Sequence, residues 1–261
     1  VIAGEAAAGN FVADFARNLA ALDVRTAVVA PAAENRSAVE DGVAVRRFRV
    51  PRLPLSLLDP RRPAEWPALA RTLAAGGRAV ERTAAEIEPD HILALWALPS
   101  GWWAMRAART RGTSFSTWAL GSDIWALGKI PLVRSLLAHV LRRAQLRFAD
   151  GLQLGRDVTA LCGRPCGFLP SSRVLVPPAG KALRERPPYR LAYLGRWHPN
   201  KGTDLLLEAM AALNGEDWRR IEAVRIFGGG PLESDVKKAT VRLTSSGRPV
   251  IVGGYLDHNG V

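Results

Sequence analysis

The sequence predicts an α/β fold made of two Rossmann-like halves, and three observations support that prediction. Up to about residue 170, short apolar runs alternate with amphipathic helical patterns, as in a parallel sheet flanked by helices. A proline-rich stretch then interrupts both patterns, and at Tyr189 the alternation begins again. We therefore expect a first domain over residues 1–170, a hinge over 171–188 and the first part of a second domain over 189–261.

In the first half, apolar runs predict strands and amphipathic patterns predict helices. The strands are expected at 25–30, 43–48, 91–96, 115–120 and 152–154. The helices are expected at 10–22, 66–87, 101–111 and 132–148. A short apolar run before residue 10 is interpreted as the end of an opening strand. The many prolines between residues 49 and 67 predict a surface excursion.

The second half opens with the most informative stretch, Tyr-Arg-Leu-Ala-Tyr-Leu-Gly-Arg-Trp-His-Pro-Asn-Lys-Gly-Thr, which ends at Thr203. An apolar strand leads to Gly195, the cations Arg196 and Lys201 follow, and Thr203 is the predicted N-cap of a helix. Backbone N–H groups and the positive end of the helix dipole would meet both cations at one spot. The pattern predicts a phosphate or diphosphate site, although a strand-to-helix loop with solvated charges explains it equally well.

The composition is that of a basic globular protein. Hydrophobic residues make up 48% of the chain, which excludes a disordered chain. The net charge of +12, from 36 Lys and Arg against 24 Asp and Glu, suggests an anionic partner. Because the basic residues are spread along the whole chain, no nucleic-acid partner is expected. The charge instead favours anionic ligands and peripheral contact with an anionic membrane.

No metal centre or membrane span is expected. Cys162 and Cys166 have no neighbouring His or further Cys to complete a zinc site, so they are interpreted as reduced structural thiols of a cytoplasmic protein. No run approaches the roughly 18 apolar residues that a spanning helix needs.

Several segments together resemble retaining GT-B glycosyltransferases of family 4. The pattern Gly-Arg-x-x-x-x-Lys-Gly after an apolar strand resembles the opening of that family's nucleotide-binding domain. Residues 224–232 and 249–255 resemble its second and third strands with their turns, and residues 96–101 and 121–123 resemble segments of its acceptor domain. The resemblance covers nearly the whole chain. It implies a GT-B fold, with two Rossmann-like domains facing a cleft and the second truncated.

The resemblance implies a donor site in the second half. In the family, the Arg and Lys of this pattern hold the diphosphate of a sugar nucleotide, which gives Arg196 and Lys201 the catalytic role of stabilising the departing diphosphate. The other implied donor-binding residues are Gly195, Gly228, Gly229 and Tyr255. The family also carries a Glu-x7-Glu pair that contacts the sugar and ribose. Glu208 and Glu216 have that spacing but lie too early in the domain, so no sugar-binding glutamate is assigned.

For the cleft or the acceptor side, the resemblance implies a second set of residues: Gly9, Asn10, Gly121, Ser122 and Asp123. Gly9 belongs to a turn whose spacing fits neither the dinucleotide nor the Walker pattern, and an ordinary tight turn explains it as well. The family commonly has His before the Gly-x-Asp segment, whereas this sequence has Leu120. This departure removes one polar contact from the sugar site. Asp123 remains as an acceptor-side or orienting carboxylate.

Two further features have alternative interpretations. Five of the eight tryptophans lie between Trp96 and Trp125, where they could stack on sugar rings or pack between helices. The predicted helix at 132–148 is basic and amphipathic, which suits either an anionic membrane surface or the face of a sheet.

The function that the resemblance implies is transfer of a sugar from a nucleoside diphosphate sugar to a carbohydrate or lipid-linked acceptor, with retention, in polysaccharide or glycolipid synthesis. No cofactor is expected, and because the chain has no Asp-x-Asp, neither is a metal. We expect a cytoplasmic protein with peripheral contact at the inner face of the membrane. As a fragment of a longer enzyme, this chain is expected to be inactive alone.

Three alternatives stay open. A P-loop nucleotidase would need Gly-Lys-Ser/Thr, whereas the order here is Lys201-Gly202-Thr203. A basic, non-catalytic module could bind anionic lipid or nucleic acid through charge alone. The chain could also be an inactive glycosyltransferase remnant.

Overall fold

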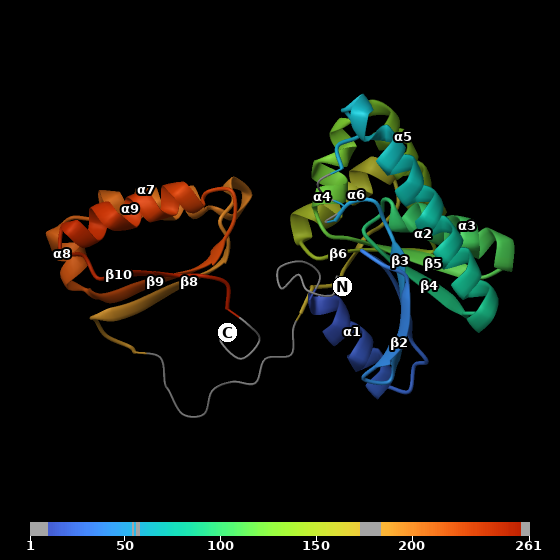
Figure 1. The fold of residues 1–261 in the computed structure, drawn as a ribbon, viewed down its shortest axis with the longest axis horizontal. Helices are drawn as coiled ribbons and strands as arrows, with labels where there is room; N and C mark the ends of the chain where they lie inside the picture. Colours follow the sequence, from blue (N-terminus) through green and yellow to red (C-terminus); the bar gives the residue numbers. More distant parts are fainter. Residues whose placement is uncertain (1–9, 54, 56–57, 173–183, 257–261) are drawn as a thin grey trace. The chain divides into compact units, whose positions relative to one another are not determined.

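A computed structural model describes residues 10–53, 55, 58–172 and 184–256. The chain separates into two compact units, Val1–Val174 and Leu175–Val261 (Figure 1). The hinge predicted at 171–188 spans this boundary, but its central part lies outside the described residues, as does the strand expected before residue 10.

The first unit contains a small mixed sheet. Its central strand β3 (Val43–Arg49) pairs in parallel with β1 (Ala27–Ala32) and antiparallel with β2 (Arg36–Glu40). β2 is not among the strands predicted from the sequence. Its residues are mostly exposed, so they carry little apolar alternation, and a tight turn with positive φ at Asp41 and Gly42 returns the chain to β3.

Alternate residues of β3 face two different neighbours. Val43 packs against Ala16 of α1 (Asn10–Ala21). Phe48, an odd number of residues further along the strand, belongs to a separate cluster and meets the ring of Trp103 edge-on, with centroids 5.7 Å apart. This alternation follows from the two-residue period of a strand, which points successive side chains to opposite faces.

A second sheet in the first unit is wholly parallel. Its strands lie in the order β4 (His91–Leu95), β5 (Ser114–Ala119), β6 (Leu146–Ala149) and β7 (Gly167–Phe168). Because every pair is parallel, the carboxyl ends of these strands meet at one edge. Loops at that edge are the usual ligand-binding positions of open α/β sheets.

Helices supply the apolar surface that buries this sheet. They are α3 (Ser100–Arg111), α4 (Ser122–Trp125), α5 (Pro131–Arg143) and α6 (Leu152–Cys162), with a short 3-10 turn at Leu127–Lys129. The long helix α2 (Trp66–Ile87), which follows a 3-10 turn at Pro63–Glu65, packs instead against α3 and against β1 and β3 of the mixed sheet. Leu137, Val140 and Leu141 of α5 are fully buried in the central cluster, together with Leu154 and Val158 of α6. Across the described parts of the chain, we find no helix with both the length and the apolar character needed to span a membrane.

Two sequence-based element assignments in this unit are wrong. The strand predicted at 152–154 is the first turn of α6, and the helix predicted at 132–148 ends at Arg143, after which β6 begins at Leu146. Three residues, Leu-Gln-Leu, are too few to distinguish a strand from a helical turn. β6 pairs with β5 through the register Ser116↔Leu146, a contact between distant residues that local periodicity does not contain.

The second unit is a three-stranded parallel sheet in the order β10 (Val250–Gly253), β9 (Ile221–Gly229) and β8 (Tyr189–Arg196). Its helices are α7 (Thr203–Ala212), α8 (Gly215–Arg219) and α9 (Glu233–Ser245). Figure 1 shows α7 and α9 on one face of the sheet. The fully buried Ile226 and Val236 join sheet and helices in one core. The sequence analysis did not predict the short α8, which a capping box between Asn214 and Asp217 opens.

Candidate functional site

In the second unit, the loops after all three strands meet at the carboxyl edge of the sheet. The N–H of Trp197, just after β8, donates to the Gly229 carbonyl at 2.9 Å, and the Trp197 carbonyl accepts from Leu232 N–H at 3.1 Å. The Gly228 N–H donates to the Gly254 carbonyl at 3.1 Å, which joins the ends of β9 and β10. The predicted donor-side segments therefore lie together, fixed by backbone hydrogen bonds.

Close backbone approach explains the glycines at this edge. Gly228 has φ +144°, and a Cβ built there would lie 1.9 Å from the carbonyl oxygen of Gly195. Gly230 has φ +148°, and a Cβ there would lie 2.7 Å from the carbonyl oxygen of Trp197. Both conformations are readily adopted only by glycine. The glycine turn thus lets two neighbouring loops pack at backbone distance.

Tyr255 lies against the same turn. Its hydroxyl donates to the Gly229 carbonyl at 2.9 Å, and a Cβ at Gly229 would come within 2.7 Å of the ring. The side chain is nevertheless 56% exposed, so part of the ring is open to a ligand at the sheet edge.

The loop between Arg196 and Thr203 differs in one detail from its prediction. Gly202, with φ +69°, is the N-cap of α7, and Thr203 is the first residue of the helix. The predicted N-cap at Thr203 is therefore wrong by one residue. The left-handed conformation at Gly202 lets the chain turn into the helix, while the fully buried Thr203 hydroxyl bonds back toward β8.

The two cations of this loop are available to a ligand. Arg196 ends β8 and Lys201 ends a 3-10 turn at Pro199–Lys201, and both are exposed. Within the ranges that the structure describes, neither side chain makes an ion pair. Their charges lie close in the chain to the N-terminus of α7, whose first N–H groups favour anions.

Sequence reasoning missed two residues that hold the site together. Trp197 is only 3% exposed. Its backbone joins the loop over residues 196–203, called the cationic loop below, to the glycine turn at residues 228–230. Tyr193 lies in β8, and its hydroxyl is 2.8 Å from the Thr203 hydroxyl. Only its position in the sequence could have indicated Tyr193, because it lies two residues before Gly195 and therefore on the same face of the strand.

In the first unit, Asp123 joins the carboxyl ends of β4 and β5. One carboxylate oxygen accepts from the Ala97 N–H at 2.7 Å and the other from the Leu120 N–H at 3.2 Å. The residue is 1% exposed. Burial raises the carboxyl pKa to about 6, although the backbone N–H donors act in the opposite direction. The geometry favours the orienting alternative for Asp123, since its side chain is enclosed by backbone.

The other predicted acceptor-side residues are spread over this edge and the start of α1. Gly121 has φ +101° and is buried, while Ser122 opens α4 and is exposed. Leu120, where the resemblance leads one to expect His, is half-buried. Asn10 is the first residue of α1, and Gly9 lies outside the described residues.

Packing accounts for the two most buried tryptophans of the first unit. Trp103 donates its indole N–H to the Leu73 carbonyl, and Trp118 donates to the Leu169 carbonyl, both at 2.9 Å. Phe11 and Phe15 of α1 contact the Trp118 ring at centroid distances of 5.4 and 5.1 Å. Trp103 and Trp118 are therefore core residues, whereas Trp125 is 51% exposed.

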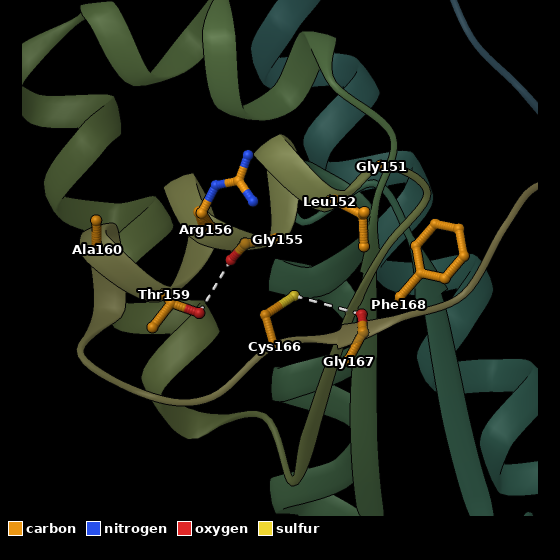
Figure 2. A pocket seen from close by; sticks show the side chains of 9 residues that line it. All are labelled: Gly151, Leu152, Gly155, Arg156, Thr159, Ala160, Cys166, Gly167 and Phe168. Carbon is orange, nitrogen blue, oxygen red and sulfur yellow. Dashed lines mark hydrogen bonds between the residues drawn. The ribbon is translucent and has the colours of Figure 1, made fainter.

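A separate hollow of about 470 Å³ lies between α6 and β7 in the first unit, and none of the predicted site residues lines it (Figure 2). Cys166 lines it, and its Sγ donates to the Gly167 carbonyl at 3.7 Å. Burial raises the pKa of the Cys166 thiol to about 11, so the thiol stays protonated at neutral pH. In the described ranges, His, Cys, Asp and Glu side chains form no group of three or more that could hold a metal ion.

No known family model matches the sequence, and no curated protein matches it. Among solved structures, the chain is similar to HepE of Anabaena in complex with UDP-glucose, at 14% identity and a TM-score of 0.62, covering 98% of this chain and 68% of HepE. A trehalose-6-phosphate synthase studied for glycosyl transfer with retention gives 12% identity and a TM-score of 0.59, covering 98% of this chain and 72% of the other. The chain has the GT-B fold.

The GT-B fold confirms the predicted fold class, including its two Rossmann-like units. A protein of Listeria monocytogenes named for UDP-N-acetylglucosamine 2-epimerase activity is also similar, at 13% identity and a TM-score of 0.55 over 98% of this chain and 68% of its own. At such identities the similarity establishes the GT-B fold, and function must be argued from the site.

Proposed function

We propose that the protein is a glycosyltransferase, which moves a sugar from a nucleoside diphosphate sugar to a hydroxyl of a carbohydrate or lipid-linked acceptor with retention. The observation that supports this most directly is the convergence of the cationic loop, the glycine turn and Tyr255 at one sheet edge. In this proposal residues 189–261 bind the donor, residues 1–170 bind the acceptor, and residues 171–188 are the hinge. Solved GT-B neighbours in complex with UDP-glucose or UDP support the donor class.

The proposed chemistry is electrostatic. Arg196 and Lys201 would contact the diphosphate, together with the first N–H groups of α7. As the bond to the sugar breaks, negative charge grows on the departing diphosphate, and fixed cations stabilise it more strongly than the bound donor. Gly195, Gly228 and Gly229 would allow the backbone to approach the phosphates, and Tyr255 would lie beside the base.

The test is diphosphate binding by the purified chain, because no sugar-contacting glutamate is assigned in it. Isothermal titration with UDP and GDP, with and without EDTA, compares the wild type with Arg196→Ala and Lys201→Ala. Each variant is expected to bind about 10- to 100-fold more weakly, since each removes a charge-assisted hydrogen bond of about 1.5–3 kcal/mol. Binding that survives EDTA would support a metal-independent site.

Two control variants match the charge changes away from the site. Arg225→Ala removes an exposed cation in the middle of β9, and Lys238→Ala removes one from α9. Both are expected to change affinity less than about twofold. If all four variants weakened UDP binding equally, the site would be diffuse surface charge, as in a basic binding module. If Arg196→Ala and Lys201→Ala bound like the wild type, the assignment would be wrong.

The similar protein named for epimerase activity shares this fold, so binding of a sugar nucleotide does not by itself distinguish glycosyl transfer from epimerisation. The Gly-Arg and Lys-Gly pattern is what favours transfer in our proposal. Incubating a complete enzyme with UDP-sugars separates the two: transfer extends an added acceptor, whereas epimerisation yields a new sugar without one. Release of free sugar only, with no acceptor product, would contradict the proposal.

We further propose peripheral contact between α5 and an anionic membrane surface, with a role in polysaccharide or glycolipid synthesis at the cytoplasmic face. The buried side of α5 covers the sheet, while its outer side exposes Leu132, at 85%, in the first turn, Arg134 one residue further on from Val133, and Arg142 and Arg143 in the last turn. An amphipathic face of this kind suits anionic headgroups. Vesicles containing phosphatidylglycerol should co-sediment the chain, and Arg142→Glu with Arg143→Glu should abolish this; equal binding to neutral vesicles would exclude it.

A further inference from the structure

One hydroxyl contacts three points of the cationic loop. The Tyr193 hydroxyl lies 2.8 Å from the Thr203 Oγ1, 3.3 Å from the Lys201 carbonyl oxygen and 3.4 Å from the Arg196 carbonyl oxygen. Thr203 Oγ1 is itself 3.4 Å from the Arg196 carbonyl. The two ends of the loop, one carrying each cation, are therefore joined through a pair of hydroxyl groups.

Each of these two hydroxyl groups has one proton to donate, and together they can supply hydrogen bonds to each other and to a loop carbonyl. One hydroxyl donates to the other, and the remaining proton goes to a carbonyl of Arg196 or Lys201. Thr203 is fully buried and Tyr193 is half-buried, so water competes little for these bonds. Backbone hydrogen bonds also hold the loop, such as those from Lys201 N–H to the His198 carbonyl at 2.9 Å and from Gly202 N–H to the Pro199 carbonyl at 3.2 Å.

We propose that Tyr193 is a positioning residue, whose hydroxyl, with that of Thr203, fixes the spacing between Arg196 and Lys201 for a diphosphate. This inference rests on the proposed function and deepens it. Two cations on long side chains bind a diphosphate best when their backbone is already set at the required separation, because less freedom is then lost on binding. The ring packs beside Gly195, which keeps the hydroxyl under the loop.

The strand supplies a matched control. Tyr189 lies four residues earlier on β8, at the opposite end of the strand, and its hydroxyl donates to the Glu185 carbonyl at 3.4 Å, outside the cationic loop. Tyr193→Phe and Tyr189→Phe remove the same atom from the same strand. Only Tyr193→Phe removes a contact with the cationic loop.

The experiment titrates the whole 261-residue chain with UDP, inorganic pyrophosphate and uridine. Tyr193→Phe is expected to weaken UDP and pyrophosphate binding about fivefold, the effect of one lost hydrogen bond, and to leave uridine binding unchanged. Tyr189→Phe should bind all three like the wild type. A purely structural role for Tyr193 would weaken uridine binding as much as UDP binding, and that result would overturn the proposal.

A second pair of variants addresses the partner hydroxyl. Thr203→Val keeps the shape and removes the hydroxyl, so it should reproduce the loss, whereas Thr203→Ser should retain wild-type affinity. These variants decide the question if Tyr193→Phe fails to fold. Wild-type affinity in Tyr193→Phe or Thr203→Val would overturn the positioning role alone. A wild type that binds neither UDP nor pyrophosphate would overturn the proposed function, and this inference with it.

Discussion

Two turns of this protein occupy equivalent places in their sheets and use their charges in opposite ways. In the second unit, β8 leads through a glycine into Arg196 and Lys201, which are exposed and, in the described part of the chain, make no ion pair. In the first unit, β5 leads through Gly121 into Asp123, which is 1% exposed and accepts backbone hydrogen bonds from two strand ends. One turn presents charge to solvent, and the other encloses it.

The difference shows what decides the role of a charged residue at this edge. The N–H groups of Ala97 and Leu120 point into the turn of the first unit, so a carboxylate is held there as their acceptor. In the cationic loop, the carbonyls of Arg196 and Lys201 accept hydrogen bonds from hydroxyl groups, and other carbonyls accept from backbone N–H groups. The side chains of Arg196 and Lys201 take no part in these bonds, which leaves them available for a ligand.

The largest expected effect tests whether the exposed turn depends on close packing between strand ends. Gly228→Ala would place a Cβ 1.9 Å from the Gly195 carbonyl oxygen at a φ of +144°. Backbone strain of roughly 1–3 kcal/mol and overpacking of roughly 1–3 kcal/mol together predict a loss of roughly 4 kcal/mol in the free energy of unfolding. Urea denaturation of the chain measures this loss.

A glycine in open space is the control for that change. Gly215 opens α8, and a Cβ there would have nothing within 4 Å. Gly215→Ala should leave the unfolding midpoint nearly unchanged or raise it slightly, because Ala favours helix. Equal losses at both positions would show that the close approach at Gly228 is not what fixes the turn.

The next effect tests the enclosed charge. Asp123→Asn replaces one of the two carboxylate oxygens by an NH2 group. This NH2 group would face either the Ala97 N–H or the Leu120 N–H, and that N–H would lose its acceptor. The cost is about 2 kcal/mol near pH 5, the penalty for one unsatisfied buried donor. The neighbouring exposed Ser122→Ala should change stability by less than about 0.5 kcal/mol. If the urea unfolding midpoint of Asp123→Asn equalled that of the wild type, Asp123 would not be what holds the ends of β4 and β5 together.

A further prediction concerns the pH dependence of the stability difference between the wild type and Asp123→Asn. The folded-state pKa of Asp123 is raised to about 6 from 3.8, so between these values the folded protein binds more protons than the unfolded chain. Wild-type stability from this group is therefore present below pH 3.8 and is lost as pH rises through 6. The stability gap between wild type and Asp123→Asn should narrow from pH 4 to pH 7. A gap that widens would mean that the carboxylate is ionised throughout.

Part of the site could be predicted because its signals are local. Gly195, Arg196 and Lys201 lie within seven residues, and an apolar strand before them and a helix after them set the place of the loop. The N-cap was misplaced to Thr203 because a threonine before a helix is a common cap. Only the left-handed backbone at Gly202 shows that the glycine takes this role.

The sequence by itself determined the alternation of strands and helices, the division into two Rossmann-like halves and the cationic loop, since each depends on residues close together in the chain. The tertiary structure decided what lies between distant segments. It placed β6 beside β5, enclosed Asp123 under the end of β4, and set Gly228 against Gly195. The physical reason is that burial and hydrogen-bond partners are properties of packed neighbours, and these neighbours come from strands about 30 residues apart in sequence.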